Sequence, residues 1–120
     1  MPTKQILCID DNADTCELLT TILGRSDLEA VSALGVDEAL RLMEGERFSL
    51  YVVDGQMPGD SGLTPCERVR AADAHTPIVI FSGHAAEGDI EAGMRAGANA
   101  YVVKPDVAEL VSTVKRLLLS

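Results

Sequence analysis

The chain has 120 residues, enough for one ordinary domain with a single hydrophobic core. Hydrophobic residues make up 47% of it and aromatic residues only 3%, so we expect a core built from aliphatic side chains. The net charge of -9 comes from 10 basic and 19 acidic residues, and it argues against direct binding of nucleic acid, which needs a basic surface.

The apolar segments and the cysteines give no targeting or zinc signal. No apolar run approaches the roughly 18 residues of a membrane span, and no signal-peptide core precedes the first strand. Cys8, Cys16 and Cys66 are widely spaced without a CxxC pair, and Cys8 lies within an apolar run, so we expect it in the core. We therefore expect a cytoplasmic protein without membrane contact.

Five short apolar runs alternate with five segments of helical pattern. The predicted strands cover 5–10, 29–34, 49–54, 77–82 and 100–103, and the predicted helices cover 13–25, 37–46, 64–73, 87–96 and 107–119. This alternation predicts an α/β fold with one doubly wound, five-stranded parallel sheet. The segment 29–34 is half polar, which is typical of an edge strand. We expect the flavodoxin-like strand order 2-1-3-4-5.

Two helix starts carry capping residues. Thr64 is followed by Pro65 and Glu67, which predicts a capping box. Asp106 is predicted to cap the last helix with its carboxylate.

A polar residue stands at the end of four apolar runs. Asp10 and Asp11 follow the first run, Asp54 follows the third, Ser82 ends the fourth, and Lys104 follows the fifth. Because the carboxyl ends of parallel strands meet at one edge, where open α/β sheets bind ligands, we expect these side chains to lie close together.

The chemistry of this cluster points to phosphoryl transfer. Three neighbouring carboxylates repel one another, so the site needs a cation. Lys104 offers one, and carboxylate oxygens favour Mg²⁺ as another. A hydroxyl, an ammonium group and Mg²⁺ around one Asp would suit a carboxylate nucleophile that forms an acyl phosphate.

Each of these residues also has a structural interpretation. Asp10 and Asp11 could cap the first helix, Asp54 could belong to a turn with Gly55, and Ser82 could cap a loop. Lys104 could be a solvated strand end. For each residue taken alone, both the structural interpretation and the phosphoryl-transfer interpretation remain open.

The motifs in order resemble the response-regulator receiver domain, the CheY-like module of two-component signalling. The landmarks are Asp10-Asp11, Asp54-Gly55-Gln56-Met57-Pro58 followed by Gly62, Ser82-Gly83, Gly97-Ala98 before Tyr101, and Lys104-Pro105. The resemblance covers essentially the whole chain, so we expect one receiver domain over residues 1–120 with no output domain.

The resemblance implies a role for each site residue. Asp54 would accept a phosphoryl group from a phosphohistidine. Lys104 would pair with Asp54 or with the phosphoryl oxygens, and Ser82 would hydrogen-bond the phosphate. Asp11, Asp54 and the backbone carbonyl of Gln56 would bind Mg²⁺ directly, and Asp10 would act mainly through a metal-bound water. A cis peptide bond is expected between Lys104 and Pro105.

Switching and partner binding are also implied. Tyr101 would turn inward when Ser82 moves toward the phosphate, although it could be only a core aromatic. Gln56 and His84 would tune dephosphorylation, or they could be plain exposed loop residues. The partners would be a histidine kinase or phosphotransfer protein, and the 87–119 face would serve a phospho-dependent homodimer or a protein target.

Four residues depart from the usual receiver pattern. Gly83 stands where Ala is common, Gly55 where a side chain is usual, Asp60 where an apolar residue is frequent, and Asp106 in place of a frequent Phe. None of these departures removes a residue of the predicted phosphoryl-transfer site. They concern the geometry of switching and the surface that a partner would bind.

Three other functions are weighed against the receiver. A haloacid dehalogenase-type phosphatase would need an acid two residues after its nucleophile, where this chain has Gln56. The usual sign of a pseudo-receiver is a missing acidic or Lys position, and none is missing in this chain. A dinucleotide-binding domain would show G-x-G-x-x-G after the first strand, and this chain has no such motif there.

Overall fold

The computed structural model describes residues 4–57 and 63–119. The landmarks Pro58 and Gly62, and the departure Asp60, lie outside the described residues.

Strands and helices alternate along the described chain as predicted. The strands are β1 (Gln5–Ile9), β2 (Glu29–Ala33), β3 (Leu50–Val53), β4 (Ile78–Ser82) and β5 (Ala100–Val103). The helices are α1 (Ala13–Gly24), α2 (Val36–Gly45), α3 (Pro65–Ala72), α4 (Glu87–Arg95) and α5 (Val107–Leu118). The predicted bounds differ from these by no more than one residue at any end.

The sheet has the predicted order β2-β1-β3-β4-β5, and every neighbouring pair is parallel. β2 lies at one edge, as its half-polar sequence indicated. Beyond the strands, the Asp54 N–H donates to the Ile9 carbonyl at 2.9 Å, and the Lys104 N–H donates to the Ser82 carbonyl at 2.8 Å. These bonds continue the pairing up to the predicted site residues.

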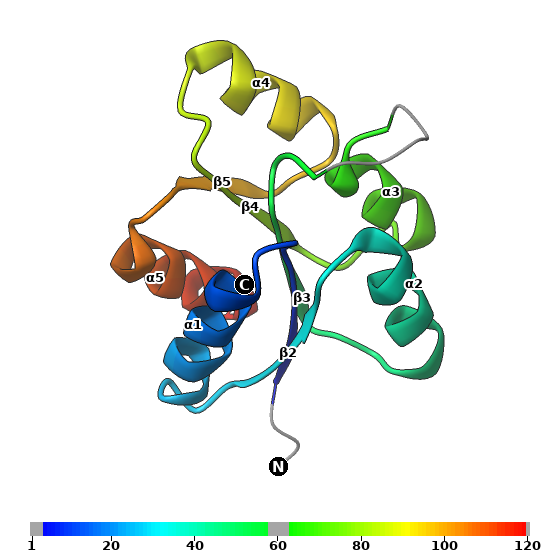
Figure 1. Ribbon diagram of the computed structural model, residues 1–120, viewed down its shortest axis with the longest axis vertical. Helices are drawn as coiled ribbons and strands as arrows, with labels where there is room; N and C mark the ends of the chain where they lie inside the picture. The colour runs from blue at the N-terminus through cyan, green and yellow to red at the C-terminus, as the bar shows by residue number, and fades with distance from the viewer. Residues whose placement is uncertain (1–3, 58–62, 120) are drawn as a thin grey trace.

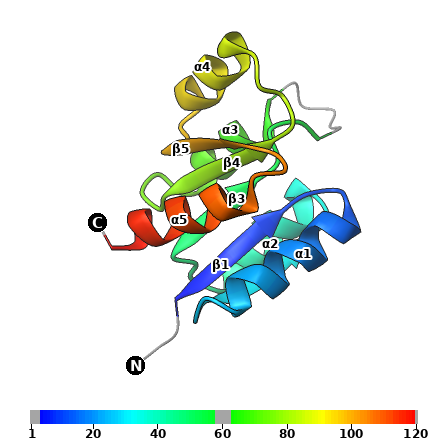
Figure 2. The same cartoon turned by 90° about the vertical axis from the view of Figure 1, so that its left-hand side faces the viewer.

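Helices cover both faces of the sheet, with α1 and α5 on one face and α2 and α3 on the other (Figure 1). The helix α4 lies beside β5, at the end of the molecule away from α1 and α2 (Figures 1 and 2). This three-layer arrangement explains the continuous apolar strand runs, because central parallel strands are buried on both faces.

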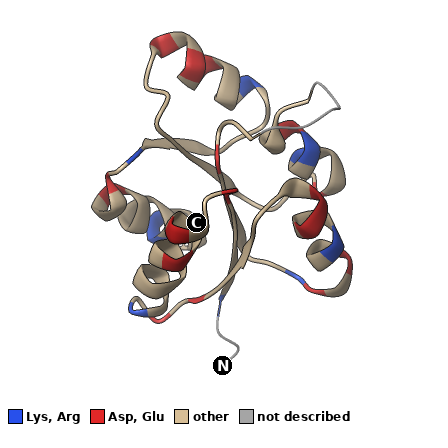
Figure 3. Ribbon diagram, viewed as in Figure 1, with Lys and Arg blue, Asp and Glu red and all other residues tan. Residues whose placement is uncertain are grey.

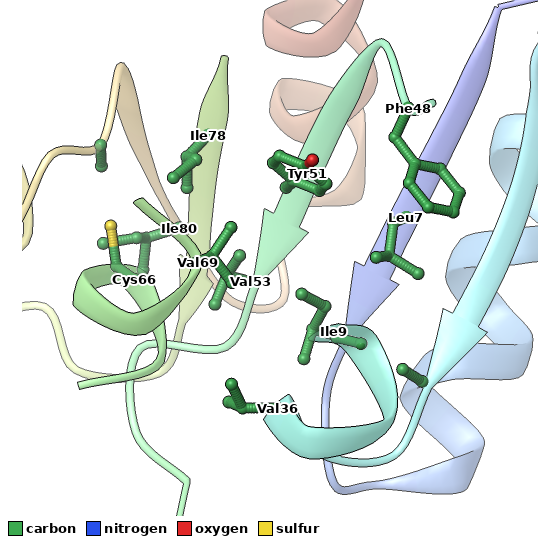
Figure 4. Packing of buried hydrophobic residues seen from close by; sticks show 13 residues of the cluster. Leu7, Ile9, Val36, Phe48, Tyr51, Val53, Cys66, Val69, Ile78 and Ile80 are labelled. Atoms are coloured by element: carbon green, nitrogen blue, oxygen red, sulfur yellow. The ribbon is translucent and has the colours of Figure 1, made fainter. Parts of the chain in front are cut away.

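Two hydrophobic clusters fill the spaces between the layers. Alternate residues of each strand point to opposite faces, so Leu7 and Ile9 join one cluster while Ile6 and Cys8 join the other. The first cluster packs under α2 and α3 (Figure 4), and the second packs under α1 and α5. Cys8 is fully buried, and this burial raises the pKa of its thiol to about 12, as suits a core residue.

The helix starts follow the capping rules. Thr64 and Glu67 form the predicted capping box, and Asp106 accepts from the Glu109 N–H at 3.0 Å. The first helix is capped by Asn12, whose side chain accepts from the Thr15 N–H. Among the described residues, no helix has the length and apolar character that crossing a membrane requires.

Candidate functional site

Three carboxylates gather at the carboxyl edge of the sheet, as predicted. β1 and β3 are neighbours, and Ile9 pairs with Val53, so the residues after these two strands meet. Oxygens of Asp10, Asp11 and Asp54 all lie within 4.8 Å of one another. Acidic segments at the ends of β1 and β3 are close together in Figure 3, with a basic segment at the end of β5.

Asp10 is the most enclosed member of the cluster. It is 3% exposed, and both of its carboxylate oxygens have partners. The Asn12 N–H donates to Oδ1 at 2.9 Å, and Lys104 Nζ lies 2.9 Å from Oδ2. Because Asn12 provides the side-chain cap of α1, Asp10 is available to the carboxylate cluster.

Lys104 extends from the end of β5 to the same carboxylates. Its Nζ lies 2.9 Å from Asp10 and 3.8 Å from Asp54, so the shorter contact is with Asp10. Asp10 is also the more buried partner, and a buried carboxylate has the greater need of a countercharge. The ammonium group lies 5.8 Å from the centroid of the Phe81 ring. The Lys104–Pro105 peptide is cis, as expected.

The pKa of Asp54 is raised above its usual value. Partial burial is the main cause, and the neighbouring negative charge of Asp10 adds to it. Lys104 and the Gln56 N–H, which donates to Oδ1 at 3.3 Å, act in the opposite direction. A second cation beside these carboxylates would favour the ionised form of Asp54, the form that can act as a nucleophile.

Ser82 packs against Gly55, the residue after Asp54, and is joined to Tyr101 through His84. Ser82 is fully buried, and its Oγ accepts from the His84 N–H at 3.2 Å. The Tyr101 hydroxyl donates to the His84 carbonyl at 2.6 Å. The side chains of His84 and Gln56 are exposed, and their tuning roles, like the metal role of the Gln56 carbonyl, stay predictions.

The structure adds two contacts that the sequence did not reveal. Cys16 donates from its thiol to the Asp10 carbonyl at 3.2 Å, so α1 supports the loop that carries the acidic pair. Gly55 allows Ser82 to pack directly beside the backbone that follows Asp54. The sequence identified Gly55 as a departure from the usual receiver pattern, but only the fold places Ser82 against it.

The donor set suits Mg²⁺. In octahedral coordination at about 2.1 Å, ligand oxygens on opposite sides of the ion are roughly 4.2 Å apart. The carboxylate oxygens of Asp10, Asp11 and Asp54 lie within 4.8 Å of one another, a separation that suits both direct ligands and a carboxylate that acts through a metal-bound water. Asp11 is exposed, which leaves room for the waters that Mg²⁺ usually retains.

Comparison with known proteins identifies the family of this chain. The family model of the response regulator receiver domain matches residues 6–115. The transcriptional regulatory protein PrrA of Mycobacterium tuberculosis is 37% identical over 117 residues, which cover 97% of this chain and 50% of PrrA. The chain thus spans about half the length of PrrA and of its similar relatives.

Two solved structures are similar along almost the whole chain. A response regulator receiver protein from Pseudomonas putida is 28% identical with a TM-score of 0.86, covering 97% of this chain and 98% of that one. Response regulator protein TrrA from Thermotoga maritima, solved in complex with Mg²⁺-BeF, is 28% identical with a TM-score of 0.80, covering 96% and 99%.

The family model covers most of the chain, and the observed fold is the CheY-like α/β fold expected from the resemblance. The assignment excludes the alternative of a turnover phosphatase. The chain belongs to the family of response regulator receiver domains of two-component signalling.

Proposed function

We propose that this chain is a phosphorylation-controlled switch in which Asp54 accepts a phosphoryl group from a phosphohistidine. The observation that supports this most is the meeting of Asp10, Asp11 and Asp54 within 4.8 Å, with Lys104 Nζ bridging two of them. Receiver domains interact with histidine kinases, so the donor is a histidine kinase or a phosphotransfer protein.

In the transfer, a carboxylate oxygen of Asp54 forms a bond to phosphorus as the bond from phosphorus to the imidazole nitrogen breaks. The electron pair stays on the imidazole, and Asp54 becomes an acyl phosphate. Lys104 and Ser82 contact the phosphoryl oxygens, where negative charge is stabilised.

Asp11, Asp54 and the Gln56 carbonyl would hold Mg²⁺, with Asp10 acting through a bound water. When bound, the ion supplies positive charge to the carboxylates and to the phosphoryl oxygens. The Mg²⁺-BeF complex of TrrA supports the choice of ion.

The added phosphoryl group brings roughly 1.5 to 2 negative charges and three acceptor oxygens beside Ser82. Movement of Ser82 would be coupled to Tyr101, and the 87–119 face would then bind a second copy or a protein target. The domain boundaries 1–120, the cytoplasmic location and the lack of nucleic-acid contact stay predictions.

The test is phosphorylation by acetyl phosphate with Mg²⁺, followed by intact-mass measurement. We expect wild type to gain one phosphoryl group, Asp54→Asn to gain none, and omission of Mg²⁺ to abolish labelling. Asp14→Asn, an exposed carboxylate in the first turn of α1, is the control and should label like wild type.

Undiminished labelling of Asp54→Asn would show that another residue accepts the phosphoryl group. An unlabelled wild type would favour the pseudo-receiver alternative.

A further inference from the structure

Two glycines border the side chains that are expected to switch. Gly55 follows Asp54 directly, and Gly93 lies in α4 opposite Tyr101. Neither has a backbone angle in the left-handed region, so conformational freedom does not explain them. Both are instead places where another residue approaches the backbone closely.

At Gly55 the neighbour is Ser82. A Cβ added to Gly55 would lie 2.8 Å from Oγ and 2.9 Å from Cβ of Ser82. A Ser Oγ can rotate away, but its Cβ is fixed to the backbone of β4. A side chain at residue 55 would therefore force β4 or the Asp54 loop to move.

At Gly93 the neighbour is the Tyr101 ring. A Cβ added there would lie 2.9 Å from Cδ2 and 3.0 Å from Cε2 of that ring, and 2.8 Å from Cδ1 of Ile80. A ring turns about its χ1 angle more easily than a strand moves. A cavity of about 370 Å³ beside Gly93 and Tyr101 gives the ring room to do so.

The two close approaches belong to one connected packing unit. Ile80 contributes Cγ2 at 3.3 Å to the Gly55 position and Cδ1 to the Gly93 position. The backbone of His84 bonds Ser82 through its N–H and Tyr101 through its carbonyl. Ser82 and Tyr101 thus share Ile80 and the His84 backbone as neighbours.

We propose that Gly55 and Gly93 are positioning residues of the switch: Gly55 lets Ser82 pack beside the acceptor loop, and Gly93 lets the Tyr101 ring pack on α4. The proposal rests on the proposed function, since the arrangement affects signalling only if a phosphoryl group binds beside Ser82. In the observed position the Tyr101 hydroxyl bonds the same His84 backbone that bonds Ser82 Oγ, and we take this position as the one that accompanies phosphoryl binding. Gly93→Ala disfavours this ring position and should therefore weaken binding at Asp54.

The ring position can be tested without any ligand by ¹⁹F NMR of fluorotyrosine-labelled protein. The chain has two tyrosines, so Tyr101→Phe assigns the signals and Tyr51 serves as an internal reference. Gly88→Ala is the matched control, because it is in the same helix and its added Cβ meets nothing within 4 Å. Both substitutions replace a helical glycine by alanine, which has the higher helix propensity.

We expect Gly93→Ala to shift the Tyr101 signal, and Gly88→Ala to leave it unchanged. A Tyr101 signal at the wild-type position in Gly93→Ala would overturn the positioning role.

The coupling is tested by titrating the same proteins with beryllofluoride in saturating Mg²⁺. We expect the apparent affinity to fall roughly five- to tenfold in Gly93→Ala and to stay constant in Gly88→Ala, since only the competent fraction binds. Equal affinities despite a shifted signal would overturn the link to the phosphoryl site. If wild type itself does not bind beryllofluoride, the proposed function fails. The NMR comparison would then still show whether Gly93 positions the Tyr101 ring.

The Gly55 contact is tested by a double-variant comparison in urea unfolding. Gly55→Ala should lower the urea midpoint in wild type and lower it much less in a Ser82→Gly background, which removes both Ser82 atoms that the new methyl would meet. An equal decrease in both backgrounds would show that Ser82 is not the residue that Gly55 accommodates.

Discussion

At the scale of single residues, the environment of each carboxyl group decides its chemistry. Asp54 is partly buried beside Asp10, and both effects raise its pKa. Asp73, at the opposite edge of the sheet, is different. Burial alone would raise its pKa, but the Tyr51 hydroxyl and the N–H groups of His75 and Thr76 all donate to it and hold the pKa well below its usual range. Hydrogen bonding to the charged form explains the contrast.

Tyr51→Phe tests how much the hydrogen bond to ionised Asp73 stabilises the fold. The Tyr51 hydroxyl donates to Asp73 Oδ2 at 2.6 Å. Loss of this hydrogen bond should lower the free energy of unfolding by about 1.5 kcal/mol at pH 7, as is usual for a hydrogen bond to a charged group. The folded pKa of Asp73 is depressed, so its contribution is complete above the unfolded value of about 3.9 and declines as pH falls below it.

The difference between wild type and Tyr51→Phe should therefore narrow in acid. Urea unfolding followed from pH 7 down to about pH 2 measures it, because the difference narrows only as pH falls toward the depressed folded pKa of Asp73, and a difference that widens in acid would contradict the assignment.

At the scale of elements, Arg70 ties α3 to the loop between α4 and β5. Its guanidinium donates to the carbonyls of Gly97, Asp73 and Thr76 and to Asn99 Oδ1, at 2.8 to 3.1 Å. Gly97 has φ 115°, and a Cβ there would lie 2.8 Å from Arg70 Cγ. The glycine thus provides both the backbone turn after α4 and the space for Arg70.

Arg70→Ala should lower the free energy of unfolding by about 2 kcal/mol, because several carbonyls lose a charged donor at once. Arg70→Lys should recover little, since an ammonium group cannot reproduce the planar set of donors. Urea unfolding gives both values.

Arg68→Ala is the control in the same helix. It removes an ion pair with the exposed Asp37, and such pairs contribute little to stability, so the urea midpoint should hardly change. Equal effects of the two alanine substitutions would show that the Arg70 contacts are no stronger than a surface pair.

At the scale of the whole molecule, the carboxylate cluster should link metal binding to stability. Mg²⁺ needs oxygens that come together only in the folded chain, so it should raise the free energy of unfolding by about 2.7 kcal/mol at a hundred times its dissociation constant. Asp11→Ala should lose most of this increase, whereas Asp14→Ala, outside the cluster, should keep it. Thermal unfolding with and without Mg²⁺ measures the effect, and an increase retained in Asp11→Ala would argue against its role as a ligand.

The burial of the helices also bears on the proposed response of the 87–119 face. Within α4 no side chain is fully buried, and its N-cap residue Ala86 makes no side-chain cap. By contrast, α5 buries Leu110, Thr113 and Val114. A helix that buries little can shift at small cost, so we expect α4 to be the element through which the proposed change at Ser82 and Tyr101 reaches the surface.

The sequence by itself determined the elements, the sheet type and the gathering of Asp10, Asp11, Asp54, Ser82 and Lys104. It could do so because burial on two faces requires continuous apolar runs, and parallel strands bring the residues after those runs to one edge. The caps at Thr64 and Asp106 were equally local, since each depends on residues three positions apart.

Only the tertiary structure decided which partners those residues have. The preference of Lys104 for Asp10, the link from Ser82 to Tyr101 through His84, and the packing of Ser82 on Gly55 all join residues from different strands and loops. Contacts of this kind depend on differences of a few tenths of an ångström in how layers pack, and residue types and spacing along the chain do not carry that information.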